Sequence, residues 1–174
     1  TDLDRMSKVV ELKTADEPRD VIHEAVQLLS EGGLVCFPTE TIYVVACDAL
    51  NEAGLQRLAA LRQQLSDEKC SLAVRDADAA VDFVPQMSEL GQRLCRRCWP
   101  GPVTLSFDQS ATGGAFEALS SNCQAAVMQA GKLRLSVPAA EVVQAVMRLM
   151  PNPLVLLGIQ RSADVPKTVG EAAM

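Results

Sequence analysis

Polar side chains that could hold a small molecule gather in one short turn, residues 38–41, and in Tyr43 just behind it. The turn lies between two apolar runs, where a sheet protein usually keeps only core residues. Two hydroxyls and a phenol can bind a substrate through hydrogen bonds, so Thr39, Thr41 and Tyr43 are candidate substrate-binding residues. Glu40 could act as a catalytic base or as a structural acceptor. The alternative is ordinary turn chemistry, in which threonine caps the loop and the tyrosine packs.

The hydrophobic pattern predicts the elements that would hold this turn. Amphipathic spacing predicts helices at residues 16–31, 52–65, two within 76–98 divided at Pro85, and 139–150. Apolar or alternating runs predict strands at residues 8–13, 34–37, 43–49, 70–74, 103–107, 126–128, 132–137 and 153–157. Residues 109–125 show little pattern and are expected to form a loop. Because strands and helices alternate, we predict an α/β protein with one sheet and a single domain over residues 1–174.

Composition narrows the classes of function. The 174 residues are 48% hydrophobic and carry a formal net charge of −6, which indicates a packed domain and disfavours nucleic-acid binding over the whole surface. No secretory signal or membrane-spanning run is visible, so we expect a cytoplasmic protein with no membrane partner. The chain begins at Thr1, and residues 168–174 resemble the first turn of a helix. We therefore expect a domain cut from a longer polypeptide, with a fused domain beyond residue 174.

The cysteines and the single histidine give little sign of a metal site. Cys95 and Cys98 form a Cys-Arg-Arg-Cys unit, but no second pair or histidine follows at the spacing of zinc ligands. Two residues of one helix are the better interpretation of this unit. His23 falls inside a predicted helix and is interpreted as a helix residue. No protein-bound metal is expected.

Three longer stretches carry a resemblance to a known family. They are GGLVCFPTETIYVVACDA at residues 32–49, CWPGPVTLSF at 98–107, and LSVP at 135–138 followed by PLVLLGIQRSA at 153–163. Their order and spacing resemble the threonylcarbamoyl-AMP synthase family, whose domain is called YrdC-like. The resemblance implies a twisted mixed sheet, parallel and antiparallel, flanked by helices around an open cleft. WPGPVT itself is interpreted as structural, with Trp99 anchoring a turn that the prolines stiffen.

The resemblance also implies a reaction. Family enzymes join threonine, bicarbonate and ATP into threonylcarbamoyl-AMP, release pyrophosphate, and serve the modification of an adenosine in tRNA. A magnesium ion is expected with the nucleotide. Because a carbamate attacks the α-phosphate, the step needs fixed cations and hydrogen-bond donors rather than a nucleophilic side chain. By the resemblance, Arg62, Lys69 and Arg134 are the expected catalytic cations.

The same resemblance assigns a nucleotide site, in which this chain departs from the family pattern. The expected nucleotide-binding residues are Ser136, Gln160, Arg161 and Ser162. Val44, Val45 and Ala46 stand where the family has Gly-Leu-Gly, and a bulkier strand there would fill space meant for substrate. Ala60 replaces a lysine, Ser136 replaces an arginine, and Gly158 replaces a serine. Lys69, Arg134 and Arg161 are the candidates to supply the missing charge, and the sequence leaves open whether they do so.

Three functions therefore remain open. The chain is a threonylcarbamoyl-AMP synthase-like nucleotidyltransferase, a carbamoyl-transferring enzyme of the same fold with other substrates, or a non-catalytic YrdC-like module. Such a module would bind nucleotide, tRNA or double-stranded RNA, or regulate a fused partner. The acidic charge counts against RNA as the main partner, because phosphate binding needs clustered cations.

Overall fold

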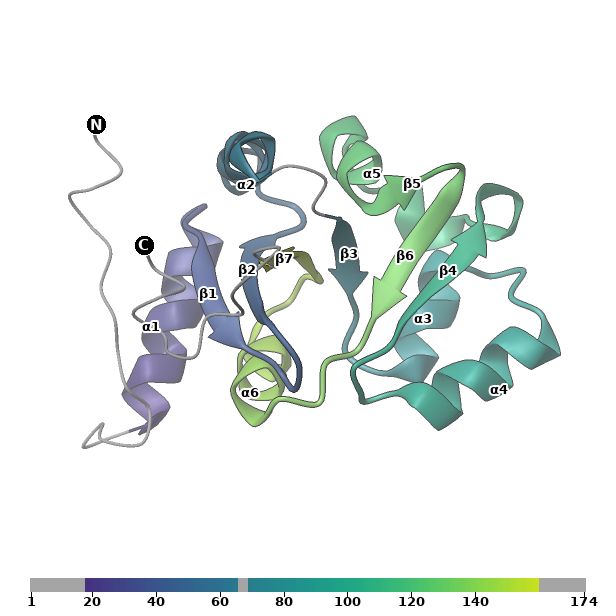
Figure 1. The fold of residues 1–174 in the computed structure, drawn as a ribbon, viewed down its shortest axis with the longest axis horizontal. Helices are drawn as coiled ribbons and strands as arrows, with labels where there is room; N and C mark the ends of the chain where they lie inside the picture. The colour runs from purple at the N-terminus through teal and green to yellow at the C-terminus, as the bar shows by residue number, and fades with distance from the viewer. Residues whose placement is uncertain (1–17, 66–68, 160–174) are drawn as a thin grey trace.

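The computed structural model describes residues 18–65 and 69–159, which form helices packed on one seven-stranded sheet (Figure 1). The helices are α1 Pro18–Ser30, α2 Glu52–Gln64, α3 Ala77–Phe83, α4 Glu89–Cys98, α5 Ser121–Val127 and α6 Glu141–Leu149, with two short 3-10 turns, η2 Gln109–Ala111 and η3 Gly114–Phe116. The strands are β1 Val35–Pro38, β2 Tyr43–Asp48, β3 Cys70–Ala73, β4 Thr104–Asp108, β5 Met128–Gln129, β6 Lys132–Ser136 and β7 Leu154–Ile159.

Local sequence signals account for several helix boundaries. The side chain of Asn51 accepts a hydrogen bond from the main-chain N–H of Gly54 and so caps α2, as its position in the sequence predicted. Ser88 caps α4 in the same way through the N–H of Gly91. Gly32 follows the end of α1 with φ +84°, a conformation that glycine adopts without steric cost.

The sheet is mixed, which confirms the predicted α/β class. Its strand order is β1-β2-β7-β3-β6-β4, and β5 pairs with β6. The pair β3–β6 is parallel, and the other pairs are antiparallel. β3 therefore lies next to strands that are distant in sequence on both sides, β6 and β7. This pairing brings residues near 70, 135 and 156 together.

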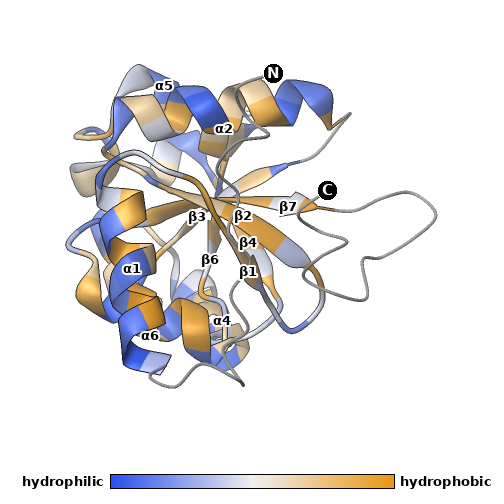
Figure 2. Cartoon of the chain, turned by 90° about the vertical axis from the view of Figure 1, so that its left-hand side faces the viewer, coloured by the Kyte–Doolittle hydropathy of each residue, from blue (hydrophilic) through white to orange (hydrophobic). Residues whose placement is uncertain are grey.

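Helices cover the two faces of the sheet unequally. Helices α2 and α5 lie on one face, while α1 and α6 lie on the other (Figure 2). One apolar core forms under α2 and α5 and includes Leu55, Leu58, Leu72, Cys123 and Leu135. A second, smaller core forms under α1 and α6. Its members on α1, β2, α6 and β7 include Ala25, Leu29, Val44, Ala46, Val143, Val146, Leu154 and Leu156.

On the α1/α6 face, the apolar surface of β2 and β7 gives way to polar side chains on β3, β6 and β4. Directly opposite residues of an antiparallel pair share a face, and Thr104 pairs with Ser136 while Ser106 pairs with Arg134. Thr104 and Ser106 are exposed. No described helix packs over the polar side chains of β3, β6 and β4 in the way that α1 and α6 pack over β2 and β7. A pocket opens where the polar and apolar parts of this face of the sheet meet.

Some of the predicted elements differ from the structure. The loop expected over residues 109–125 is wrong for residues 121–125, which belong to α5, because Ser120 accepts a hydrogen bond from the N–H of Cys123 and caps this helix. The strand expected at residues 126–128 is wrong for its first two residues, which end this helix, although the hairpin through Gly131 to β6 is confirmed. The strand expected at residues 8–13 lies outside the described residues. Within the described ranges, no helix has the length and apolar character to cross a membrane.

Candidate functional site

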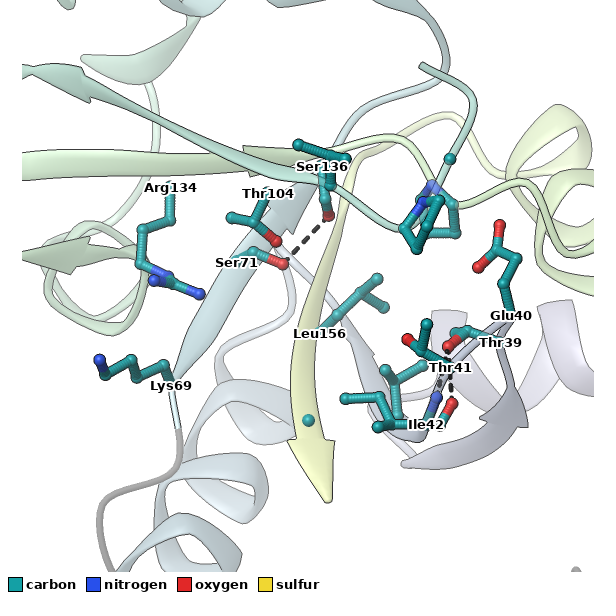
Figure 3. A pocket seen from close by; sticks show the side chains of 16 residues that line it. Thr39, Glu40, Thr41, Ile42, Lys69, Ser71, Thr104, Arg134, Ser136 and Leu156 are labelled. Atoms are coloured by element: carbon teal, nitrogen blue, oxygen red, sulfur yellow. Dashed lines mark hydrogen bonds between the residues drawn. The ribbon is translucent and has the colours of Figure 1, made fainter. Parts of the chain in front are cut away.

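A pocket of about 290 Å³ opens between the turn that joins β1 to β2 and the polar part of the sheet (Figure 3). This is near the lower end of the roughly 300–1,000 Å³ typical of small-molecule sites. Its lining comes from the β1–β2 turn, β2, β3, β7, β6, the start of β4 and the segments before β4 and after β6. The lining residues are Thr39, Glu40, Thr41, Ile42, Val44, Lys69, Ser71, Gly101, Pro102, Val103, Thr104, Arg134, Ser136, Pro138, Leu156 and Gly158.

The β1–β2 turn is closed by its own threonine. The Thr39 hydroxyl donates to the main-chain oxygen of Ile42 at 2.6 Å, and the N–H of Ile42 returns a bond to that hydroxyl at 3.3 Å. The main-chain N–H of Thr39 also donates to the Ile42 oxygen, at 2.9 Å. Thr39 therefore performs the turn chemistry that was the alternative to substrate binding, although it also lines the pocket. Thr41 is exposed and lines the pocket from the same turn.

Glu40 fastens the turn to the segment after β6. Its Oε1 accepts a hydrogen bond from the main-chain N–H of Ala139, which is 99 residues away in sequence. Next to this clip, the side-chain amide of Gln144 on α6 donates to the main-chain oxygen of Pro138 at 2.5 Å. Of the two roles open to Glu40, this geometry supports the structural acceptor.

Two cations lie on the side of the pocket opposite the β1–β2 turn. Lys69, just before β3, and Arg134, on β6, extend toward the same region in Figure 3, away from the threonines of the turn. The Nε of Arg134 donates to the main-chain oxygen of Cys70 at 3.0 Å, and its Nη1 donates to Oε1 of Gln129 at 3.3 Å. Among the described residues, these bonds involve Nε and Nη1 and leave Nη2 of Arg134 to face an anion. Glu40, the one acidic side chain among the described lining residues, is held at the far side.

Hydroxyls line the floor between the cations and the turn. Ser71 on β3 and Ser136 on β6 lie 3.0 Å apart, oxygen to oxygen, and share a hydrogen bond, with 8% and 7% of their surfaces exposed. A hydroxyl pair has two O–H groups, and one suffices for the bond between the serines, so one O–H can donate to a ligand. Thr104, opposite Ser136 across the β4–β6 pair, adds a third hydroxyl. We call Lys69, Ser71, Thr104, Arg134 and Ser136 the polar lane.

One wall of the pocket is apolar. Ile42, Val44 and Leu156 line it, together with Gly158, and we call these four residues the apolar wall. Val44 and Gly158 are directly paired across β2 and β7. A Cβ atom at Gly158 would lie 2.9 Å from Cδ1 of Ile42, so the end of the isoleucine occupies the space of a side chain at position 158. The predicted filling of the cleft by Val44 is consistent with this wall.

The segment with two prolines forms a further wall. Trp99 is buried, and its indole N–H donates to the main-chain oxygen of Val103 at 2.6 Å, which confirms its expected anchoring role. The peptide bond between Trp99 and Pro100 is cis. The N–H of Gly101 donates to the oxygen of Val137 at 2.9 Å and joins this turn to the end of β6. Residues 101–104 also line the pocket, so the purely structural interpretation of this segment was incomplete.

The predicted site residues fall into three groups. Thr39, Thr41, Lys69, Arg134 and Ser136 all line the pocket. Tyr43 and Arg62 do not: Tyr43 pairs with Ile159 at the start of β2, where alternation turns it to the face opposite Val44. Gln160, Arg161 and Ser162 lie outside the described residues.

Arg62 belongs to the last turn of α2, a helix of the other face. Arg62 lies close enough to Cys70 to affect the pKa of its thiol. Burial raises the pKa of Cys70, and this effect is larger than the lowering caused by the charges of Arg62 and Arg134. Arg62 thus lies near the cationic side of the pocket without lining it. Ser71 and Leu156 line the pocket although the sequence pattern did not predict them there. The signal available for Ser71 was a hydroxyl-bearing residue inside a buried strand.

The buried thiols Cys47, Cys70, Cys95 and Cys123 have the properties of inert cysteines. Burial raises the pKa of Cys95 to about 11 and that of Cys123 to about 12, and it also raises the pKa of Cys47. Cys95 donates to Sδ of Met87 at 3.7 Å inside the core. Within residues 18–65 and 69–159, no group of three or more His, Cys, Asp or Glu side chains is placed to hold a metal ion.

Comparison with known proteins connects this chain to a protein family. The sequence model of the Sua5/YciO/YrdC family, described as "Telomere recombination", matches residues 27–172. The threonylcarbamoyl-AMP synthase of Shigella flexneri is 30% identical over 95 residues, which are 53% of this chain and 50% of that protein. The chain thus spans half the length of that curated relative.

Solved structures share the fold. A double variant of Sua5 from P. abyssi superposes with a TM-score of 0.71 at 22% identity, covering 92% of this chain and 45% of that one. Sua5 of P. abyssi complexed with L-threonine gives a TM-score of 0.64 at 23% identity, covering 80% of this chain and 38% of that one. At these identities the superpositions establish the arrangement of the sheet and helices.

Proposed function

The chain belongs to the Sua5/YciO/YrdC family, and from that premise we propose that its pocket makes threonylcarbamoyl-AMP from threonine, bicarbonate and ATP, with release of pyrophosphate. The names of curated relatives and the threonine complex of a structural neighbour support the reaction. The observation that carries the proposal is the pocket itself, which brings together five of the predicted site residues.

The polar lane suits the phosphates. Lys69 and Arg134 supply positive charge without a described acidic neighbour on that side, and Ser71, Ser136 and Thr104 supply hydroxyls between them and the turn. Charge-assisted hydrogen bonds of this kind are the strong ones, and an arginine whose Nε is already fixed loses little freedom on binding. We assign the lane to the α-phosphate and the departing pyrophosphate.

The chemistry fits groups of this type. The threonine amine first combines with bicarbonate to give a carbamate and water. A carbamate oxygen then attacks the α-phosphorus of ATP, the bond from that phosphorus to the bridging oxygen breaks, and pyrophosphate leaves with the electron pair. Negative charge grows on phosphate oxygens throughout, which fixed cations and hydroxyl donors stabilise. Magnesium would enter with ATP as part of the substrate.

The β1–β2 turn is assigned to the amino acid. Thr39 and Thr41 line the side of the pocket opposite the cations, and Glu40 fixes the turn to the segment after β6. An amino acid held there would present its carbamate toward the lane. Because Tyr43 is turned to the other face, we do not assign it to substrate. Gln160, Arg161 and Ser162 remain proposed nucleotide-binding residues on the sequence pattern alone.

The later step, transfer of the threonylcarbamoyl group to tRNA in the cytoplasm, is proposed from the family. The net charge of −6 restricts any contact with tRNA to a local surface.

A second candidate function is a non-catalytic module that binds nucleotide. The position of Arg62 outside the pocket favours this module. It leaves Lys69 and Arg134 as the two cations in the described lining, whereas three cations were expected for the reaction.

Pyrophosphate release separates the two functions. Pure protein is given ATP, magnesium, bicarbonate and threonine, with an authentic threonylcarbamoyl-AMP synthase assayed in parallel. Release that requires both threonine and bicarbonate supports the synthase. Binding of ATP without release of pyrophosphate, whether or not threonine and bicarbonate are present, would reject the synthase and support the module.

A further inference from the structure

One exposed side of α4 combines leucines with arginines. Leu90, Arg93, Leu94 and Arg97 follow the spacing i, i+3, i+4, i+7, which places them along one side of the helix. All four are exposed, and the two leucines keep 59% and 40% of their surfaces accessible. The buried residues of α4 lie on its other side. We call these four exposed residues the basic stripe.

The basic stripe has the composition of a contact surface. No described residue forms a hydrogen bond or an ion pair with Arg93 or Arg97. Single exposed leucines are ordinary, but apolar side chains rimmed by charged ones mark sites of protein contact, where arginine is enriched. The stripe therefore fits a partner that offers both carboxylates and apolar side chains.

Helix α1 carries a stripe with the opposite charge. Asp20, Glu24, Leu28 and Glu31, the last of them directly after the helix, follow the spacing i, i+4, i+8, i+11 and share one side. All four are exposed, and Leu28 keeps 45% of its surface accessible. We call these four residues the acidic stripe. Each stripe thus sets exposed leucine among charges, and the two signs are complementary.

The two stripes lie at opposite ends of the molecule (Figure 1). α1 packs against α6, β1 and β2, and β1 is one end of the strand order. α4 packs against α3, and Phe107 of β4, the other end of that order, lies beside Gly91 of α4. The stripes are therefore too far apart to meet within one copy of the chain, and they can meet only between copies.

We propose that the basic stripe of one copy binds the acidic stripe of a second copy, so that the protein associates with itself head to tail. Such a contact joins two different patches and leaves one stripe of each kind free at the ends of a dimer. Because the net charge of −6 makes two copies repel each other on average, the pairing of opposite stripes selects this orientation. Neither stripe lines the pocket, so the inference does not depend on the proposed function.

A second copy matches the stripe better than other anionic partners do. The phosphates of RNA would pair with the arginines but would leave Leu90 and Leu94 without an apolar partner. An anionic membrane would accept the leucines, but its surface potential repels a protein with a net charge of −6. The acidic stripe supplies carboxylates and a leucine together.

The association should be weak and sensitive to salt. One helix against one helix makes a smaller contact than the standard interface of about 800 Å² per partner. We therefore expect a dissociation constant of about 10 μM to 1 mM. Raising the salt concentration from about 0.1 M to about 1 M shortens the Debye length from about 10 Å to about 3 Å, and it should raise this constant at least about tenfold.

The test is sedimentation velocity of the protein from about 10 μM to 1 mM, at low and at high salt. The double variant Arg93→Glu, Arg97→Glu reverses the basic stripe, and Glu24→Lys, Glu31→Lys reverses the acidic stripe. Each double variant alone should stay monomeric, because its two stripes then carry the same sign. An equal mixture of the two should associate again, because each reversed stripe meets a stripe of opposite sign on the other variant.

The controls separate this contact from a general effect of charge. Lys132→Glu, Arg148→Glu changes the net charge as much as the arginine variant does, at two exposed positions outside both stripes, and should associate like the unaltered protein. Leu94→Gln keeps every charge but removes an apolar contact, so it should weaken association. Thermal unfolding establishes that each variant is folded.

Self-association that is lost in each reversed variant and restored in their mixture supports the inference. A protein that stays monomeric at every concentration overturns it, as does association that survives either reversal or fails to return in the mixture. Binding of tRNA or of anionic vesicles that requires Arg93 and Arg97, by a protein that stays monomeric, also overturns it and assigns the basic stripe to that partner. Pyrophosphate release is measured on the same variants and should be unchanged, so the proposed function stands or fails separately.

Discussion

The guanidinium of Arg134 is fixed to the backbone of a neighbouring strand, with its Nε donating to the main-chain oxygen of Cys70 at 3.0 Å. The parallel pairing of β3 with β6 creates this contact between residues 64 apart in sequence. The bond orients the arginine beside Lys69, at the cationic side of the pocket (Figure 3). A cation held in this way is prepared for an anionic ligand before the ligand arrives.

Replacing Arg134 by glutamine should weaken the binding of ATP and pyrophosphate. A hydrogen bond to a charged group is typically worth about 1.5–3 kcal/mol, which corresponds to roughly 10–150-fold in the dissociation constant. The measurement is calorimetric titration with each ligand, and Arg148→Gln is the control because Arg148 is exposed on α6 outside the lining. If Arg134→Gln binds both ligands as tightly as Arg148→Gln does, Arg134 does not contribute to binding them.

The serine pair should show energetic coupling. Ser71→Ala and Ser136→Ala are each expected to lower the free energy of unfolding by about 0.5–1.5 kcal/mol, because each removes the same buried hydrogen bond. The double variant should lose less than the sum of the two, by a coupling energy of at least about 0.5 kcal/mol. Urea unfolding measures this cycle, with Ser106→Ala as the exposed control on β4. Strict additivity would show that the two hydroxyls do not interact in solution.

Glu40 is expected to act as a structural acceptor. Glu40→Gln keeps an oxygen that can accept from the N–H of Ala139, so activity should remain within about tenfold, whereas loss of general-base catalysis typically costs about 10²–10⁴-fold. Glu40→Ala removes the acceptor and should loosen the turn, with a higher KM for the amino acid. Steady-state kinetics of the two variants decides the matter: a large fall in kcat for Glu40→Gln would identify a catalytic base.

Buried thiols should make the protein less stable at high pH. Folding raises the pKa of Cys95 to about 11 and of Cys123 to about 12, so the folded state keeps protons that the unfolded state releases near pH 9. Their stabilising contribution is complete below pH 9 and is lost as pH rises from 9 toward 11 and 12. Urea unfolding at a series of pH values should show a shallower decline for Cys95→Ala than for the unaltered protein. Parallel declines would contradict the effect of burial.

Elements with local signals could be predicted from the sequence. Asn51 and Gly32 mark the boundaries of α2 and α1 by their own chemistry, and alternation along β6 placed Arg134 and Ser136 on one face. α5 was missed because its seven residues include few large apolar side chains, and its cap at Ser120 was not recognised in a polar stretch.

Which residues line the pocket depends on strand pairings that cannot be predicted from sequence patterns. Lys69 lies on the same side of the pocket as Arg134 because β3 pairs with β6, and Leu156 lines the pocket because β7 lies between β2 and β3. Tyr43 was grouped with the turn because it is adjacent in sequence, but β2 begins at that residue and its alternation turns the phenol to the other face. Non-local strand order thus decided which of the candidates could meet one ligand.

Pyrophosphate release in the presence of threonine, bicarbonate, ATP and magnesium, compared between the unaltered protein and Arg134→Gln, tests the central claim most directly. The account predicts release that requires both threonine and bicarbonate and that falls by at least about tenfold in Arg134→Gln, while Arg148→Gln remains unchanged. Release that is absent from the unaltered protein, or equal in Arg134→Gln, would contradict the assignment of this pocket to threonylcarbamoyl-AMP synthesis.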